Sequence, residues 1–132
     1  DIMTIGKGLG SGFPVSGLVS TDEITKSPPW GNPSGSSSSY GANPMAGAAA
    51  LAAVTVIEEE GLVEHAARLG EWMLGRFRQM QERHEFIGHV QGKGLLIGVE
   101  LVKDRKTREP LDKRICVRIF QECLRRGLIS MV

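Results

Sequence analysis

The sequence has no apolar run close to the length that crosses a bilayer. The longest candidate, residues 45–57, is short and rich in alanine and other small residues, whereas a membrane-spanning helix needs about 20 apolar residues. An excess of charge is also lacking, because sixteen Lys and Arg residues face fifteen Asp and Glu residues. These absences argue against a membrane or a nucleic acid as partner.

Cysteine and histidine are scarce. Cys116 and Cys123 share one face of a predicted helix, and one helix does not easily bridge two of its own residues at that spacing. We therefore expect buried, reduced thiols, which fit a cytoplasmic location. The three histidines, His65, His84 and His89, have no metal-like spacing. We expect them at surface or helix-end positions, with no metal.

The composition is that of a globular protein rather than a disordered one, with 41% hydrophobic and 23% charged residues. Its 132 residues are enough for one domain with a core. The sequence starts in an apolar run at residues 2–5 and stops in another at residues 128–132. We therefore expect a piece of a longer chain.

Glycine, proline and capping residues divide the first half of the sequence into short elements. Thr21 is a suitable helix cap, and Asn43 followed by proline is a strong helix start. Residues 27–42 are turn formers almost throughout, and so long a loop is usually functional or disordered. The predicted elements are strands at residues 2–5 and 13–19, a glycine loop at 6–12, a short helix to residue 26 and a helix at about 44–59, stopped by Gly61.

The second half changes from helical to strand periodicity. An apolar stripe with spacings of three and four predicts one long amphipathic helix. A Gly-Lys-Gly turn then joins two period-two segments. The predicted elements are a helix at residues 61–84, strands at 86–91 and 95–102, a charged loop at 104–110, a helix at 112–126 closed by Gly127, and a strand at 128–132.

Lys7 lies between two glycines directly after the first predicted strand. The flanking glycines leave its amine open, as a lysine needs if it is to attack an aldehyde and form a Schiff base. On these residues alone, an exposed loop lysine is the more common interpretation. A phosphate-binding loop is a weaker one, because the upstream glycine spacing and the following Ser or Thr are lacking.

Three segments, in order, carry a family resemblance. Residues 1–14 (Asp-Ile-Met-Thr-Ile-Gly-Lys-Gly-Leu-Gly-Ser-Gly-Phe-Pro) resemble the cofactor-lysine segment of the class III aminotransferases. Residues 39–44 (Ser-Tyr-Gly-Ala-Asn-Pro) resemble that family's second signature, and residues 92–100 resemble a hairpin of its C-terminal domain. The chain is thus similar to omega-, ornithine- and 4-aminobutyrate-type enzymes that depend on pyridoxal 5'-phosphate (PLP).

The resemblance implies an α/β fold, part of the fold type I PLP-dependent transferase (aspartate-aminotransferase-like) architecture. Residues 1–60 would be the C-terminal part of the PLP-binding large domain, residues 61–84 a connecting helix, and residues 85–132 the start of the small C-terminal domain. The Asp, glycine-rich turn and aromatic residue that the family also uses for PLP lie outside this chain. The fragment alone is therefore expected to be inactive.

The resemblance also assigns roles in cofactor binding. Lys7 would be catalytic and would carry PLP as a Schiff base. Ser39, with Ser38 beside it, would bind the cofactor phosphate across a dimer interface, and serine keeps the hydroxyl of the family's usual threonine. The alternative for residues 36–39 is a flexible polar linker. Ala42 stands where the family has a second glycine, so we expect its backbone to avoid positive φ.

Substrate binding is less clearly marked. Gln91 stands where many family members have an arginine that binds the substrate carboxylate, and glutamine cannot form that bidentate ion pair. Gln91 is a candidate substrate-binding residue or only a polar strand end. Trp30 would line a substrate entrance or pack as a loop anchor, and Trp72 would lie in a core or an interface. The basic residues at 105–108 and 113–114 are interpreted as solvated charge.

The implied function is transfer of an amino group from an amine or omega-amino acid donor to a 2-oxo acid acceptor. The resemblance implies a homodimer or larger assembly with a shared active site. One alternative is an ammonia lyase or phospholyase of the same family, acting on an amino-alcohol phosphate or phosphonate. Another is a non-catalytic domain that has kept the fold, against which the presence of Lys7 argues.

Overall fold

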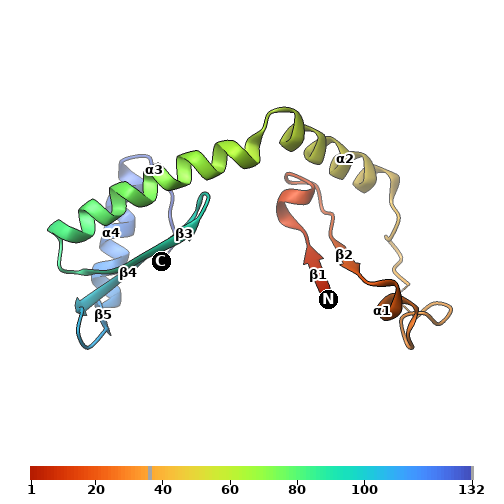
Figure 1. Cartoon of the computed structure of the whole chain (residues 1–132), viewed down its shortest axis with the longest axis horizontal. Helices are drawn as coiled ribbons and strands as arrows, with labels where there is room; N and C mark the ends of the chain where they lie inside the picture. Colours follow the sequence, from red (N-terminus) through yellow and green to blue (C-terminus); the bar gives the residue numbers. More distant parts are fainter. Residues whose placement is uncertain (36, 132) are drawn as a thin grey trace. The chain divides into compact units, whose positions relative to one another are not determined.

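The computed structural model describes residues 1–35 and 37–131. Their contacts divide the chain into two units, Asp1–Leu62 and Val63–Val132 (Figure 1), each with its own antiparallel sheet. Two predictions fall partly outside the described residues, because Ser36 belongs to the predicted serine linker and Val132 to the predicted last strand.

The first unit begins with a two-stranded hairpin. Strand β1 (Ile2–Ile5) pairs with strand β2 (Gly17–Ser20), so that the last residue of β1 lies opposite the first of β2. The prediction for β1 is confirmed, but β2 is shorter than predicted. The backbone N–H of Phe13 is engaged in a turn with the Gly10 carbonyl oxygen (3.0 Å), and Pro14 has no N–H to donate to a strand.

Two capped helices follow the hairpin. Helix α1 (Asp22–Lys26) starts where the Thr21 hydroxyl accepts from the Ile24 N–H (3.4 Å). Helix α2 (Pro44–Glu59) starts where the Asn43 side chain accepts from the Met45 N–H (2.9 Å). Gly61, with φ of 59°, follows its end. Both predicted starts and the predicted stop are confirmed.

The second unit is built on a three-stranded sheet in the order β3-β4-β5, with strands β3 (Ile87–Lys93), β4 (Leu96–Asp104) and β5 (Glu109–Pro110). Helix α3 (Leu62–Arg83) lies along this sheet (Figure 1). Leu74 of α3 packs with Ile87 and Val90 of β3 to form the buried core, surrounded by Phe77, Ile97, Val99 and Leu101. The apolar stripe predicted for the long helix is confirmed only in part. Phe77 borders this core, whereas Leu62, Leu69 and Met80 are exposed, and the buried Leu74 was not part of the predicted stripe.

A pair of glycines marks the contact between α3 and the β3–β4 turn. A Cβ added to Gly70 would lie 2.1 Å from the carbonyl oxygen of Gly94, so no side chain fits there. Gly94 itself adopts φ of 55° in the turn, a conformation that glycine adopts at little cost. The predicted Gly-Lys-Gly turn is confirmed, and it also forms the site of closest approach to the helix.

The charged loop predicted for residues 104–110 is wrong at its end, because Glu109–Pro110 forms β5 against β4. The Lys103 amine donates to the Glu109 carboxylate (2.5 Å), and this hydrogen bond raises the pKa of Lys103. The Asp104 side chain accepts from the N–H groups of Lys106 and Thr107. These local bonds close a turn that charge composition alone does not reveal.

Helix α4 (Lys113–Arg125) completes the second unit. Asp112 caps it by accepting from the Arg114 N–H (2.7 Å), and Gly127 follows with φ of 87°, as predicted. The strand predicted after it is wrong for residues 128–131, which form no strand because no described strand pairs with them. Cys116 and Cys123 are unpaired and only half-buried, so the prediction of buried thiols is wrong in their burial, and their reduced state stays a prediction.

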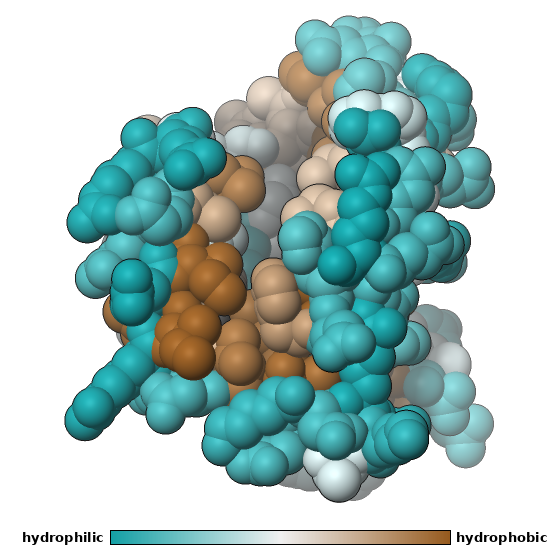
Figure 2. Space-filling model, turned by 90° about the vertical axis from the view of Figure 1, so that its left-hand side faces the viewer, coloured by the Kyte–Doolittle hydropathy of each residue, from teal (hydrophilic) through white to brown (hydrophobic). Residues whose placement is uncertain are grey.

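Apolar surface remains uncovered in both units. The buried apolar side chains among the described residues are Leu74, Ile87, Val90 and Val102. Many other large apolar side chains are exposed, and Figure 2 shows one such face, with brown apolar side chains bordered by teal polar ones. No helix in the described part of the chain has the length and apolarity needed to cross a membrane.

Candidate functional site

Lys7 opens a short 3-10 turn, η1 (Lys7–Leu9), at the end of the β1–β2 hairpin. Its φ of 51° lies in the left-handed region, which residues other than glycine seldom adopt. The Gly10 N–H donates to the Lys7 carbonyl oxygen (3.2 Å) and holds this conformation. Within residues 1–35 and 37–131, the exposed Lys7 amine has no hydrogen-bond or ion-pair partner. The turn thus presents an unengaged amine, as the sequence predicted.

The opposite side of this turn is anchored. Leu9 is half-buried, and a Cβ added to Gly17 would lie 3.9 Å from Leu9 Cδ2 and 3.2 Å from Ile5 Cγ1. The small residue in β2 therefore leaves room for the leucine at the end of the hairpin. Helix α2 also contacts η1. Backbone strain of this kind persists where the surroundings enforce it, and it clusters at functional sites.

Two predicted phosphate-binding serines precede α2. Ser38 Oγ accepts from the Tyr40 N–H (3.3 Å), its carbonyl oxygen accepts from the Gly41 N–H (3.3 Å), and Ser39 is exposed. The first turn of α2 contains no acidic residue. Serine hydroxyls beside a helix N-terminus suit an anion such as phosphate. No hydrogen bond among the described residues joins Lys7 to either serine.

The expectation that Ala42 avoids positive φ is wrong. Its φ is 58°, in the left-handed region. The turn that closes on Ser38 must reach the extended backbone of Asn43 before α2 starts, and this change of direction places Ala42 in that conformation. A residue other than glycine is less favourable in the left-handed region by about 1–2 kcal/mol. Ala42 nevertheless keeps the backbone conformation that a glycine would adopt at this position.

The two tryptophans are both exposed. Trp30 is 53% exposed in a segment of tight turns, where the Gly31 N–H donates to the Ser27 carbonyl oxygen (2.9 Å). A place at the substrate entrance and a packed anchor both stay predictions for Trp30. Trp72 is 64% exposed on α3, and a position in a core or an interface stays its prediction.

Gln91 is exposed on β3, opposite Gly98 of β4. A Cβ added to Gly98 would lie 3.7 Å from Gln91 Cγ and 4.0 Å from its Nε2, so the amide group extends over the glycine. Gln91 belongs to the second unit, whereas Lys7 and the serines belong to the first. At this position the structure therefore has a neutral, exposed amide group that is able to form hydrogen bonds.

Arg105 has a role that the sequence did not reveal. Its Nε donates to the carbonyl oxygens of Ile87 (3.0 Å) and Glu85 (3.2 Å), and a terminal nitrogen donates to those of His84 (2.7 Å) and Gln81. Solvated charge is therefore the wrong interpretation of this residue. Carbonyl groups at a helix C-terminus favour a cation, and no local sequence signal pairs Arg105 with partners 18–24 residues away.

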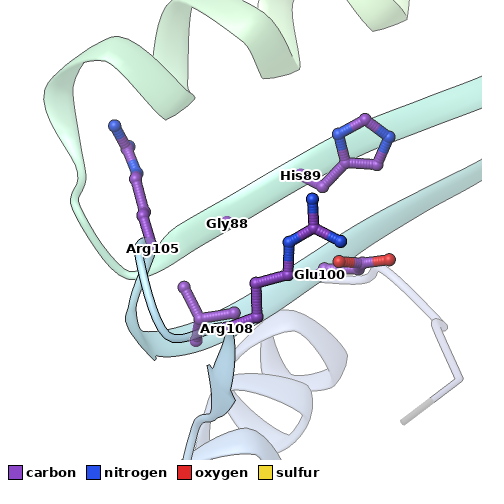
Figure 3. A pocket seen from close by; sticks show the side chains of 6 residues that line it. Gly88, His89, Glu100, Arg105 and Arg108 are labelled. Atoms are coloured by element: carbon purple, nitrogen blue, oxygen red, sulfur yellow. The ribbon is translucent and has the colours of Figure 1, made fainter.

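A hollow of about 240 Å³ lies beside Arg105 on the sheet. It is lined by Gly88, His89, Glu100, Val102, Arg105 and Arg108. In Figure 3, Arg108 points toward His89 and Glu100, while Arg105 points away toward the end of α3. In the described part of the chain, no group of three His, Cys, Asp or Glu residues is placed to hold a metal ion.

Comparisons with known proteins match almost the whole chain. The family model "Aminotransferase class-III" matches residues 1–131. A mitochondrial alanine–glyoxylate aminotransferase 2 from Pongo abelii is 40% identical over 98% of this chain and 25% of its own length. An ethanolamine-phosphate phospho-lyase homolog from Caenorhabditis elegans is 42% identical over 89% and 24%, and a leucine/methionine racemase from Thermococcus litoralis is 47% identical over 83% and 24%.

The structural comparison gives the same result. A PLP-bound amine transaminase from an uncultivated Pseudomonas species is 33% identical, with a TM-score of 0.86 over 99% of this chain and 31% of its own. The chain spans about a quarter of the length of these curated relatives. The expected partial α/β, fold type I architecture is thereby confirmed. With the family model matched over residues 1–131, the chain belongs to the class-III aminotransferase family.

Proposed function

We propose that the protein carrying this chain is a PLP-dependent aminotransferase in which Lys7 is the catalytic residue. The observation that carries the proposal is the Lys7 turn. Its amine is exposed and unengaged on a backbone held in the left-handed region, inside the segment that matches the family model. The reaction would transfer an amino group from an amine or omega-amino acid to a 2-oxo acid.

The described residues fit PLP, the cofactor that family membership implies. Lys7 would hold it covalently through its amine, and Ser38, Ser39 and the N-terminus of α2 would bind its phosphate. When bound, PLP supplies the electron sink for the reaction. Once displaced by the amino substrate, Lys7 Nζ would take the proton from the substrate carbon that bears the nitrogen.

Gln91 would favour donors without a carboxylate at this position. Its amide is neutral and extends over Gly98 in open space, so it can donate a hydrogen bond but cannot make a bidentate ion pair. Trp30, exposed in the turns before the serines, would line the substrate entrance. A simple amine or an omega-amino acid fits this neutral surface better than an α-amino acid.

We assign residues 1–60 to the large domain, residues 61–84 to the connecting helix and residues 85–132 to the small domain. The exposed apolar side chains of both units support a homodimeric or larger assembly with a shared active site. The unpaired Cys116 and Cys123 support a cytoplasmic location.

A second candidate function is a PLP-dependent lyase that eliminates ammonia and phosphate from an amino-alcohol phosphate. The phospho-lyase homolog, 42% identical to this chain, supports it, as does the neutral Gln91. The two reactions differ in the fate of the nitrogen. An aminotransferase leaves it on the cofactor, whereas a lyase releases it as ammonia in every cycle.

The test uses the complete protein that carries this chain, loaded with PLP and mixed with candidate amines but no oxo acid. We expect one equivalent of the cofactor to become aminated, seen by absorbance, without continuous release of ammonia. Lys7→Ala should abolish this conversion, whereas Lys26→Ala, which removes an exposed lysine paired with Asp22, should not. Continuous ammonia release would establish the lyase instead, and an active Lys7→Ala variant would refute the assignment of Lys7.

A further inference from the structure

Gly10 connects the Lys7 turn to the segment that follows it. Its N–H donates to the Lys7 carbonyl oxygen (3.2 Å), and its own carbonyl oxygen accepts from the Phe13 N–H (3.0 Å). Gly10 is also the residue of this loop that is fully buried, although it carries no side chain. Both hydrogen bonds depend on how closely the Lys7 turn and residues 13–15 approach each other.

Glycine is needed at position 10 because there is no room for a side chain, and not because of its backbone conformation. The φ of Gly10 is −112° and its ψ is 1°, values that other residues also adopt. A Cβ added there would lie 2.5 Å from the Phe13 carbonyl oxygen and 2.4 Å from Val15 Cγ1. Gly8, two residues earlier, has nothing within 4 Å of such a Cβ. A Cβ added to Gly6 would make only ordinary contact with the following segment, 3.8 Å from the Val15 carbonyl oxygen. The close approach is therefore specific to Gly10 among the glycines of this loop.

Helix α2, which contacts this turn, carries a face of small, half-buried side chains. The helix contacts η1, and its half-buried alanines, Ala46, Ala49, Ala50 and Ala53, follow spacings of three, one and three. This spacing places them on one helix face. A Cβ added to Gly47 meets nothing within 4 Å, so that side of the helix is open. A helix face of alanines has side chains small enough for a close approach to a neighbouring turn.

We propose that Gly10 is a positioning residue for Lys7 and that the alanine face of α2 is the surface that supports the turn from the other side. The proposal rests on the proposed function of Lys7. Any side chain at Gly10 pushes residues 13–15 away, breaks the bond to the Lys7 carbonyl oxygen and releases the left-handed φ of Lys7. The amine then no longer has a fixed direction.

The test follows capture of PLP by the complete protein. Borohydride reduction followed by mass spectrometry gives the rate at which Lys7 acquires a pyridoxyl group, and absorbance against pH gives the titration midpoint of the lysine-linked cofactor. We expect Gly10→Ala to slow capture about tenfold or more, as misplacement of a reacting group does, and to move the midpoint. Gly75→Ala is the matched control, because a Cβ there meets nothing within 4 Å.

A second variant decides the matter if Gly10→Ala does not fold. Ala50→Leu enlarges the half-buried alanine face, and Ala48→Leu makes the same change at an exposed position of α2. Slower capture and a moved midpoint in Ala50→Leu, but not in Ala48→Leu, support the proposal. A folded Gly10→Ala variant with the capture rate and midpoint of the parent overturns it. Pyridoxyl capture that persists in Lys7→Ala would instead refute the proposed function.

Discussion

Arg105 shows how a single side chain organises the second unit. Its guanidinium group donates to four backbone carbonyl oxygens, two in the last turn and end of α3 and two around the start of β3. The Gln81 side chain adds a bond to the Gly88 carbonyl oxygen (2.8 Å). Side chains therefore donate hydrogen bonds to several of the backbone carbonyl oxygens where the chain reverses between α3 and β3.

We predict that Arg105→Gln lowers the free energy of unfolding by about 2 kcal/mol, because one hydrogen bond to a charged group contributes about 1.5–3 kcal/mol and the exposed position of Arg105 weakens each of its bonds. Urea denaturation of the complete protein, followed by the fluorescence of Trp72 on α3, measures the change. Arg108→Gln is the control, because Arg108 has no hydrogen bond among the described residues. Equal losses in both variants would contradict the capping role.

Residue-level roles could be predicted where the partners are close in sequence. Thr21 and Asn43 cap helices by accepting hydrogen bonds from N–H groups three and two residues further along the chain, and both caps could be predicted from the order of residues. The catalytic role of Lys7 was inferred from its glycines and the family resemblance, and it stays a prediction. Arg105 was not, because its partners lie 18–24 residues away. The positive φ of Ala42 was also missed, since alanine gives no signal for it.

At the scale of elements, helices followed the sequence more closely than strands did. Caps located the starts of α2 and α4, and apolar spacing located α3 as a helix but missed its buried residue Leu74. The length of β2 and the existence of β5 depend on pairing with another strand, as do residues 128–131, which have none. Strand pairing is a property of the fold, and local residue patterns do not determine it.

The contact between α3 and the β3–β4 turn predicts stability changes of opposite sign for two glycine-to-alanine substitutions in the same helix. Gly70→Ala should destabilise the protein by about 1–3 kcal/mol, the cost of overpacking, because its Cβ would lie 2.1 Å from the Gly94 carbonyl oxygen. Gly75→Ala, in the same helix with nothing within 4 Å, should instead stabilise it by up to about 1 kcal/mol through helix propensity.

Thermal and urea denaturation of the two variants against the parent measure this difference. The substitution is identical and the host helix is the same, so intrinsic propensity cancels between them. A Gly70→Ala variant as stable as Gly75→Ala would show that α3 does not approach the turn this closely.

At the scale of the molecule, apolar surface exceeds what the described residues can cover. Few side chains are buried, while Leu51, Tyr40 and Leu96 are 70%, 80% and 84% exposed. The curated relatives are about four times as long as this chain, and the family signature for cofactor binding is only partly within it. Both observations point to further polypeptide around the units.

We predict that the isolated 132 residues bind a hydrophobic dye such as ANS strongly and show no aminotransferase turnover. Uncovered apolar side chains bind the dye, and Lys7 without the remaining cofactor contacts has no complete site. Dye fluorescence and an amine-dependent assay with PLP provide the measurements, with the complete protein as control. Turnover by the isolated chain at the rate of the complete protein would show that the site is misplaced.

The four carbonyl bonds of Arg105 also bear on how the second unit opens. The end of α3, the start of β3 and the loop after β4 share one guanidinium group, so none of them can detach without releasing the others. Local opening occurs in cooperative units of this kind. We therefore expect three segments that are separate in the sequence to open as one unit, so that their amide protons exchange with solvent together.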